Sequence, residues 1–156
     1  MRLQIIAVGH KMPAWVDNAF DDYSRRLSGH NAVSLSLVAT ANRKPGTSIE
    51  QCRQQEADKI SKHIKPGSHT IALDEHGRQW STQEWAEQYR GWRLQYPAVN
   101  FIIGGPDGLD PGLLQKANAK VALGRLTLPH GLARVVLIEQ LYRAWSVCEG
   151  HPYHRE

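Results

Sequence analysis

The residues best suited to chemistry lie in three loops that follow short apolar runs. Residues 73–77 (LDEHG) and 104–108 (GGPDG) each come directly after an expected buried strand, and residues 123–130 (LGRLTLPH) end in a histidine. In an open α/β sheet, ligands bind beyond the carboxyl ends of the strands. A ligand held by these loops would meet mainly backbone amides and leucine side chains, which suits a flat heteroaromatic ring better than a phosphate.

The final segment brings together three groups of different chemistry. Tyr153 supplies a ring for stacking, His154 a titratable imidazole and Arg155 a permanent cation. This combination suits an unpaired nucleobase close to phosphates. A frayed terminus is the plainer interpretation, because last residues often lack fixed structure.

Other common site motifs are missing from the sequence. GGPDG does not match G-x-G-x-x-G, and no G-x-x-x-x-G-K-[ST] phosphate loop occurs. On turn chemistry alone, GGPDG is a tight turn after a buried strand. Asp74, Glu75, Asp107 and Asp110 show no metal-ligand spacing, so we expect solvated loop charge and helix capping, and no metal.

Apolar periodicity predicts a scaffold of alternating strands and helices for these loops. Strands are expected at about residues 3–8, 33–38, 70–73 and 99–103, with a fifth strand or strand-like loop at 123–128. Helices are expected at about residues 15–27, 48–64, 82–94, 111–119 and 131–148. This alternation favours an α/β fold with a mostly parallel sheet and helices on both faces.

Length and composition narrow the class of protein. The 156 residues are 41% hydrophobic and 22% charged, which is typical of one globular domain and excludes disorder, collagen and coiled coil. The longest aliphatic run covers residues 135–138, and no amino-terminal signal is present, so we expect a cytoplasmic protein without a membrane span. The net charge of +4 permits an anionic partner. Cys52 and Cys148 are expected to be two separate reduced thiols.

Five motifs, taken in order, resemble one known family. They are L-D-E-x-G at 73–77, I-I-G-G-P-D-G at 102–108, L-T-L-P-H-x-L-x-R at 126–134, E-Q-x-Y-R-A at 139–144 and H-P-Y-H-R at 151–155. From residue 3 to its end the chain is similar to the bacterial RlmH-type pseudouridine N3-methyltransferases of large-subunit ribosomal RNA, which belong to the SPOUT class. The resemblance implies one domain over residues 1–156, a trefoil knot near the carboxyl terminus, a homodimer, and S-adenosylmethionine (SAM) as methyl donor.

The resemblance also implies which residues surround SAM, and the chemistry of the remaining candidates leads us to expect the roles given after them. Those expected to surround SAM are Leu73, Gly105, Leu123, Gly124, Arg125, Leu126, Thr127 and Leu128. His130 and the Tyr153-His154-Arg155 tail, the tail from the partner subunit, would line the base pocket. Arg143 and Arg155 would stabilise negative charge or hold phosphate, His154 would accept a proton, and Tyr153 would stack on or hydrogen-bond to the base.

The expected activity is therefore SAM-dependent methylation of N3 of a pseudouridine in 23S rRNA. Since the sequence contains no separate RNA-binding domain, the substrate would be recognised by its shape across a basic dimer face. An assembled ribosome or large subunit is the expected substrate, rather than free RNA. Two other classes stay open: a non-catalytic RNA-binding assembly factor, and a small hydrolase that uses His130 or His154 as general base but lacks an evident nucleophile or metal set.

Overall fold

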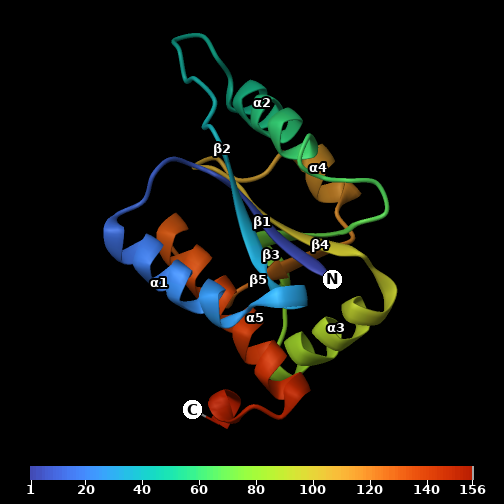
Figure 1. The fold of residues 1–156 in the computed structure, drawn as a ribbon. Coiled ribbons are helices and arrows are strands. Elements are labelled where there is room, and N and C mark those ends of the chain that lie inside the picture. The colour runs from blue at the N-terminus through green and yellow to red at the C-terminus, as the bar shows by residue number, and fades with distance from the viewer. Residues whose placement is uncertain (156) are drawn as a thin grey trace.

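A parallel sheet forms the centre of the structure, which is a computed structural model that describes residues 1–155 (Figure 1). Over this range the sheet has five strands in the order β2-β1-β4-β3-β5, and all four pairings are parallel. The strands are β1 (Arg2–Val8), β2 (Val33–Val38), β3 (His69–Gln79), β4 (Ala98–Ile103) and β5 (Ala119–Ala122). The predicted α/β fold with a mostly parallel sheet is confirmed.

Helices cover both faces of the sheet, as expected (Figure 1). The first face packs against α1 (Ala14–Arg26), α3 (Thr82–Gln95) and α5 (His130–Glu149). The second face packs against α2 (Ile49–Ser61) and the short α4 (Pro111–Lys116). Because successive strand residues point to opposite faces, Ile5 of β1 belongs to the first core and Ile6 to the second. Two 3₁₀ helices, η1 (Gly29–Asn31) and η2 (Pro152–Arg155), complete the described chain.

Capping boxes start two of these helices. Ser48 accepts a hydrogen bond from the backbone N–H of Gln51, and the Gln51 side chain accepts one from the backbone N–H of Ser48. Ser81 and Glu84 form the same reciprocal pair at the start of α3. Each box satisfies backbone N–H groups that have no partner within the helix. The predicted helix starts at these two positions are confirmed.

Two elements near the candidate loops differ from the sequence-based prediction. β3 continues to Gln79, although residues 74–77 were expected to turn, because Arg78 and Gln79 pair with β5 after a register shift. The fifth strand ends at Ala122, and residues 123–129 form an irregular loop instead of a strand. Gly124 has a φ of +150°, and Leu126 is 80% exposed, so this leucine-rich segment leaves the sheet instead of extending it.

Both cysteines are free thiols, as predicted; Cys52 is buried and Cys148 is partly buried. Cys52 lies on α2 and is 2% exposed. Cys148, near the end of α5, donates a hydrogen bond to the Ala86 carbonyl oxygen at 3.4 Å. Burial raises the pKa of the Cys148 thiol, although the neighbouring Arg90 and Arg93 act in the opposite direction.

Two further expectations concern the chain as a whole. Across residues 1–155, no helix has the length and apolar character needed to cross a membrane. The trefoil knot stays a prediction, because strand order and pairing do not specify how the chain threads through itself.

Candidate active site

A pocket of about 330 Å³ lies beyond the carboxyl ends of β4 and β5 and beside the middle of β3. Its lining comes from residues 73–75 of β3, from residues 103–106, 108 and 109 at the end of β4 and after it, and from residues 121–124, 126–128, 130 and 133 between β5 and the first turn of α5. The three loops singled out from the sequence therefore meet at one place. This is the edge at which open α/β sheets bind their ligands.

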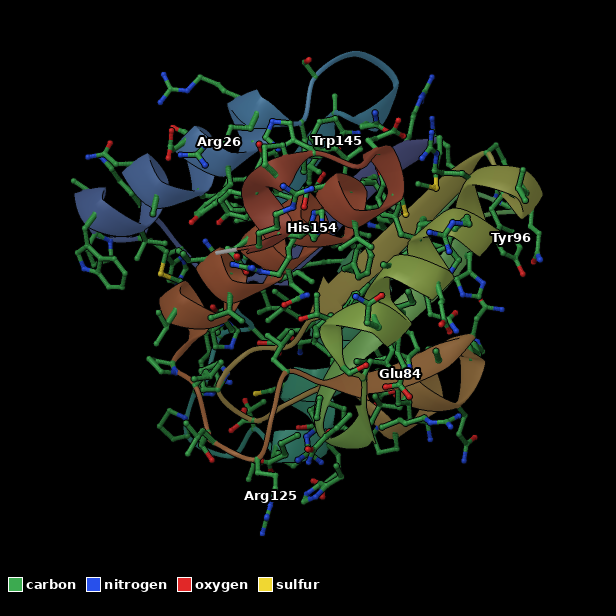
Figure 2. The ribbon with its side chains drawn as sticks, turned by 90° about the horizontal axis from the view of Figure 1, so that it is seen from below. Arg26, Glu84, Tyr96, Arg125, Trp145 and His154 are labelled. Atoms are coloured by element: carbon green, nitrogen blue, oxygen red, sulfur yellow. The ribbon has the colours of Figure 1, made fainter. Side chains whose placement is uncertain are left out.

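Glycine backbone and leucine side chains make up much of the pocket wall. Of the residues expected to surround SAM, seven line it: Leu73, Gly105, Leu123, Gly124, Leu126, Thr127 and Leu128. Arg125 does not, and Figure 2 shows its side chain pointing outward from the molecule. Asp74 and Glu75 add carboxylates to the lining. Among the described residues, no group of three or more His, Cys, Asp or Glu is placed to hold a metal ion.

The loop after β4 is a tight turn, as its sequence predicted. The backbone N–H of Gly108 donates to the Gly105 carbonyl oxygen at 3.0 Å, and Gly108 has a φ of +81°. A Cβ added to Gly104 would lie 2.7 Å from the carbonyl carbon of Gly108. Since that neighbour is backbone, a side chain at residue 104 would force the turn open.

A buried carboxylate packs behind this turn. Glu56 of α2 is 2% exposed, and its Oε2 accepts a hydrogen bond from the backbone N–H of Ala41 at 2.9 Å. Its Oε1 has no hydrogen-bond partner among the described residues and lies 3.0 Å from where a Gly105 Cβ would be. The sequence reasoning missed Glu56, because nothing distinguishes it there from the exposed acids of a polar helix.

Two arginines tie the same turn to neighbouring segments. Arg43 forms an ion pair with Asp107 and approaches the Glu56 carboxylate at 3.9 Å. Arg53 donates from Nε to the Asp107 carbonyl oxygen at 2.8 Å. The basic loop around Arg43 and the helix α2 are thus both bonded to Asp107 in the turn that forms part of the pocket wall.

The first turn of α5 places an imidazole at the pocket. His130 lines the pocket, and its Nδ1 has no hydrogen-bond partner within the described chain. Burial is the main cause that lowers the pKa of His130, and the positive charge of Arg134 lowers it further. A hydrogen bond to the Gly105 backbone and the negative charge of Glu56 act in the opposite direction. The lowered pKa favours the neutral imidazole, which is the form able to accept a proton.

One turn further along α5 lies a buried guanidinium. Arg134 is 1% exposed, and neither its Nε nor its Nη2 has a hydrogen-bond partner among residues 1–155. Burial lowers the pKa of Arg134, against an opposing effect of Asp17. Its Nη2 lies 3.0 Å from where a Cβ on Gly9 would be. The only signal in the sequence was the place of Arg134 in the third of the five motifs, at 126–134, and no role was predicted for it.

The other predicted catalytic residues lie at the opposite end of α5. Arg143 follows His130 by 13 residues, which places it about 20 Å away along the helix axis. Figure 2 shows His154 beside this end of the helix, with Arg26 and Trp145 close to it and Arg125 far away. A single chain therefore does not bring Arg143, Tyr153, His154 and Arg155 into the pocket.

The tail packs against α1 and α5 through Tyr153. The Tyr153 hydroxyl is hydrogen-bonded to Glu139 Oε1 at 3.0 Å and to the Tyr23 hydroxyl at 3.1 Å. Arg143 donates from Nε to Glu139 Oε1 at 2.9 Å, and its guanidinium carbon lies 5.0 Å from the centre of the Tyr153 ring. Burial and these hydrogen bonds raise the pKa of Tyr153. Residues 152–155 form η2, so the frayed-terminus interpretation is not supported.

Comparison with known proteins agrees with this geometry. A family model described as predicted SPOUT methyltransferase matches residues 1–154. The chain is 44% identical over 155 residues to the ribosomal RNA large subunit methyltransferase H of Burkholderia cenocepacia and to that of Burkholderia vietnamiensis, with 99% of each protein covered. Among solved structures, a probable methylase family protein from Haemophilus influenzae Rd KW20 has a TM-score of 0.54 at 17% identity, over 97% of this chain and 69% of that one, which shows a shared fold. The protein belongs to the SPOUT methyltransferase family.

Proposed function

We propose that this protein transfers a methyl group from SAM to N3 of a pseudouridine in 23S rRNA. It acts in the cytoplasm as a homodimer, on the assembled ribosome or large subunit, with residues 1–156 as one domain and no metal. The observation that carries the proposal is the pocket of glycine backbone and leucine side chains at the carboxyl edge of the sheet. The full-length similarity to ribosomal RNA large subunit methyltransferases supports the choice of substrate.

The pocket fits SAM in size and chemistry. Its volume of about 330 Å³ lies within the usual range for sites of small ligands. Leu73, Leu123 and Leu128 offer apolar contacts for an adenine ring, and the turn at Gly105 lets backbone approach closely. The carboxylates of Asp74 and Glu75 favour a ligand that carries a sulfonium cation.

When bound, SAM supplies an activated methyl group on sulfur. The residues of this chain then have to hold the acceptor nitrogen in line with that group and remove the N3 proton. We assign proton acceptance to His154, whose Nδ1 is buried without a hydrogen-bond partner among the described residues, and a lining role to His130. Arg143 and Arg155 stabilise the negative charge on the ring oxygens, and Glu139 orients Arg143 through their ion pair.

A homodimer accounts for the separation of the two residue groups. Arg143 lies about 20 Å along α5 from His130 of its own chain. Tyr153 packs against Glu139 and Arg143 instead of the pocket, so a tail contributed by the partner subunit would complete the site. Trp15 of α1 is 57% exposed and Leu126 beside the pocket is 80% exposed. Large apolar side chains with this exposure suit burial against a second copy of the chain.

The test measures methyl transfer from labelled SAM to large subunits, whole ribosomes and naked rRNA, followed by mass analysis of the nucleosides. We expect N3-methylpseudouridine in the ribosomal samples and little product on naked RNA. Tyr153→Phe, His154→Ala and Arg155→Ala should retain SAM affinity and lose methyl transfer. The largest loss is expected for His154→Ala, whose transfer rate should fall by about 100-fold or more relative to the wild type. A folded dimer that does not bind SAM would contradict the proposal, and SAM binding without transfer to any RNA would favour the non-catalytic assembly factor.

Hybrid dimers test whether the tail acts across the interface. One chain carries Gly104→Ala in the pocket and the other carries His154→Ala in the tail, so each homodimer is impaired in every site. If the tail acts on the partner subunit, random mixing restores about a quarter of the wild-type sites. If it acts on its own chain, mixing restores none.

A further inference from the structure

A second pocket, of about 250 Å³, lies at the opposite edge of the sheet from the candidate SAM site. It is formed by the first residues of β1 and β4, by β2, and by residues 62–68 between α2 and β3. Figure 1 shows the amino terminus, the start of β4 and the loop after α2 on the same side of the molecule.

The floor of this pocket belongs to a row of polar side chains across four strands. The strand register pairs Ser34 with Gln4, Gln4 with Asn100, and Asn100 with Thr70. The strands of buried parallel sheets are usually apolar on both faces, so a polar row at this depth is unusual. Asn100 is 2% exposed, and its Nδ2 donates to Ser68 Oγ at 2.9 Å and to Thr70 Oγ1 at 3.2 Å.

The rim of the pocket is positively charged. Arg2, Lys62 and Lys65 supply three exposed permanent cations, and His63 supplies a titratable ring. None of the nine described lining residues carries a carboxylate, whereas Asp74 and Glu75 line the candidate SAM pocket. Cations of one sign around a concave surface focus a positive potential into it.

We propose that this basic pocket, defined by Arg2, Lys62, His63, Lys65 and Asn100, binds the phosphodiester backbone of the RNA substrate. The proposal rests on the proposed function, because it treats the pocket as a second contact for the same RNA. The rim cations pair with phosphate, and the hydroxyl and amide groups of the floor hydrogen-bond to phosphate or ribose oxygens. Contacts of this kind fix the position of the RNA on the protein but do not select a base.

The geometry explains how a small chain could hold a large RNA. The seven residues of β1 separate the two pockets by about 20 Å. A strand held at the basic pocket is therefore restrained at a distance from the nucleotide that reacts. That restraint reduces the entropy lost when the base enters the candidate SAM site.

The test compares two double variants that lose the same charge. Lys62→Gln with Lys65→Gln alters the basic pocket, and Lys116→Gln with Lys120→Gln removes two exposed lysines outside it. We expect the pocket variant to bind large subunits about tenfold more weakly, with a slope of log affinity against log salt that is shallower by about 1.5. Its KM for large subunits should rise while kcat and the Kd for SAM stay unchanged, and the control variant should match the wild type.

Each other outcome contradicts either the RNA-binding role of the basic pocket or the proposed function. Equal losses in both variants would mean that net charge matters and the pocket does not. A pocket variant with normal affinity, in a protein that methylates large subunits, would overturn the pocket and leave the proposed function standing. A wild type that methylates nothing, but whose affinity for a single-stranded RNA oligonucleotide falls in the pocket variant, would overturn the function and leave the pocket. Binding of inorganic phosphate to the pocket, with RNA affinity unchanged in the variant, would assign it to a small anion instead.

Discussion

The two edges of the sheet present different chemistry to a ligand. At the carboxyl edge, glycine turns and leucine side chains form a pocket whose charged side chains are the carboxylates of Asp74 and Glu75. At the amino edge, Arg2, Lys62 and Lys65 surround a polar floor that contains no carboxylate among its described residues. A parallel sheet places all strand ends of one kind together, so one small sheet is able to serve a cationic ligand at one edge and a polyanion at the other.

The largest effect expected at the carboxyl edge comes from Gly104→Ala. The added Cβ would lie 2.7 Å from the Gly108 backbone, so the turn must open, and SAM affinity should fall by about 100-fold. Titration calorimetry measures this. The matched control is Gly91→Ala in α3, where nothing lies within 4 Å of the new Cβ, and where the change should raise the free energy of unfolding by about 0.5–1 kcal/mol. Normal SAM affinity in Gly104→Ala would remove the turn from the site.

Salt should weaken RNA binding at the amino edge much more than SAM binding at the carboxyl edge. Raising the salt concentration from 50 to 200 mM should weaken binding to large subunits by more than about tenfold, because phosphate contacts release counterions. SAM binding should change by less than about twofold, because it pairs one sulfonium charge with the carboxylates of Asp74 and Glu75 and releases no counterions from a polyanion. Filter binding and calorimetry on the same protein preparation check both values. An equal response of SAM and RNA to salt would contradict the division between the edges.

Each edge also holds a histidine whose pKa is lowered by burial. His130 lines the carboxyl-edge pocket, and His69 begins β3 at the amino edge, stacked on Tyr96 at 4.5 Å between ring centres. Below the unfolded pKa of about 6.5, the unfolded chain binds more protons than the folded one, so stability should fall as the pH drops through 6.5 toward the folded values.

Denaturant unfolding at pH 7.5 and pH 5.5 measures this loss, which should not exceed about 1.4 kcal/mol per histidine per pH unit. His69→Gln and His130→Gln should each reduce the difference between the two pH values. Two variants with the wild-type difference would show that neither ring is kept neutral by the fold.

The smallest effect is expected from Arg125→Ala. The side chain points away from the body of the molecule and does not line the pocket (Figure 2), while the substitution keeps the backbone of the loop. SAM affinity should therefore change by no more than about twofold. A tenfold loss, measured by calorimetry, would show that the guanidinium turns inward when SAM binds.

Local patterns predicted the scaffold well because each element depends on near neighbours in the sequence. The starts of α2 and α3 follow from capping residues three positions apart. The end of β3 was missed because the pairing of Arg78 and Gln79 with β5 depends on residues more than 40 positions away.

The candidate site was predicted where it depends on loop sequence, and missed where it depends on burial. Glycine and leucine loops beyond strand ends indicated the pocket. The burial of Glu56 and Arg134 results from packing between elements, which no local pattern contains. Likewise, Gln4, Ser34 and Asn100 become neighbours only through strand register.

The burial of Cys52 and the partial burial of Cys148 have a practical consequence for labelling. Cys52 on α2 is 2% exposed, and burial raises the pKa of the Cys148 thiol. Thiolate is the form that reacts with maleimides and other alkylating reagents. A single cysteine introduced on an exposed surface would thus be the preferred point of attachment for a fluorophore or spin label, without prior removal of either natural residue.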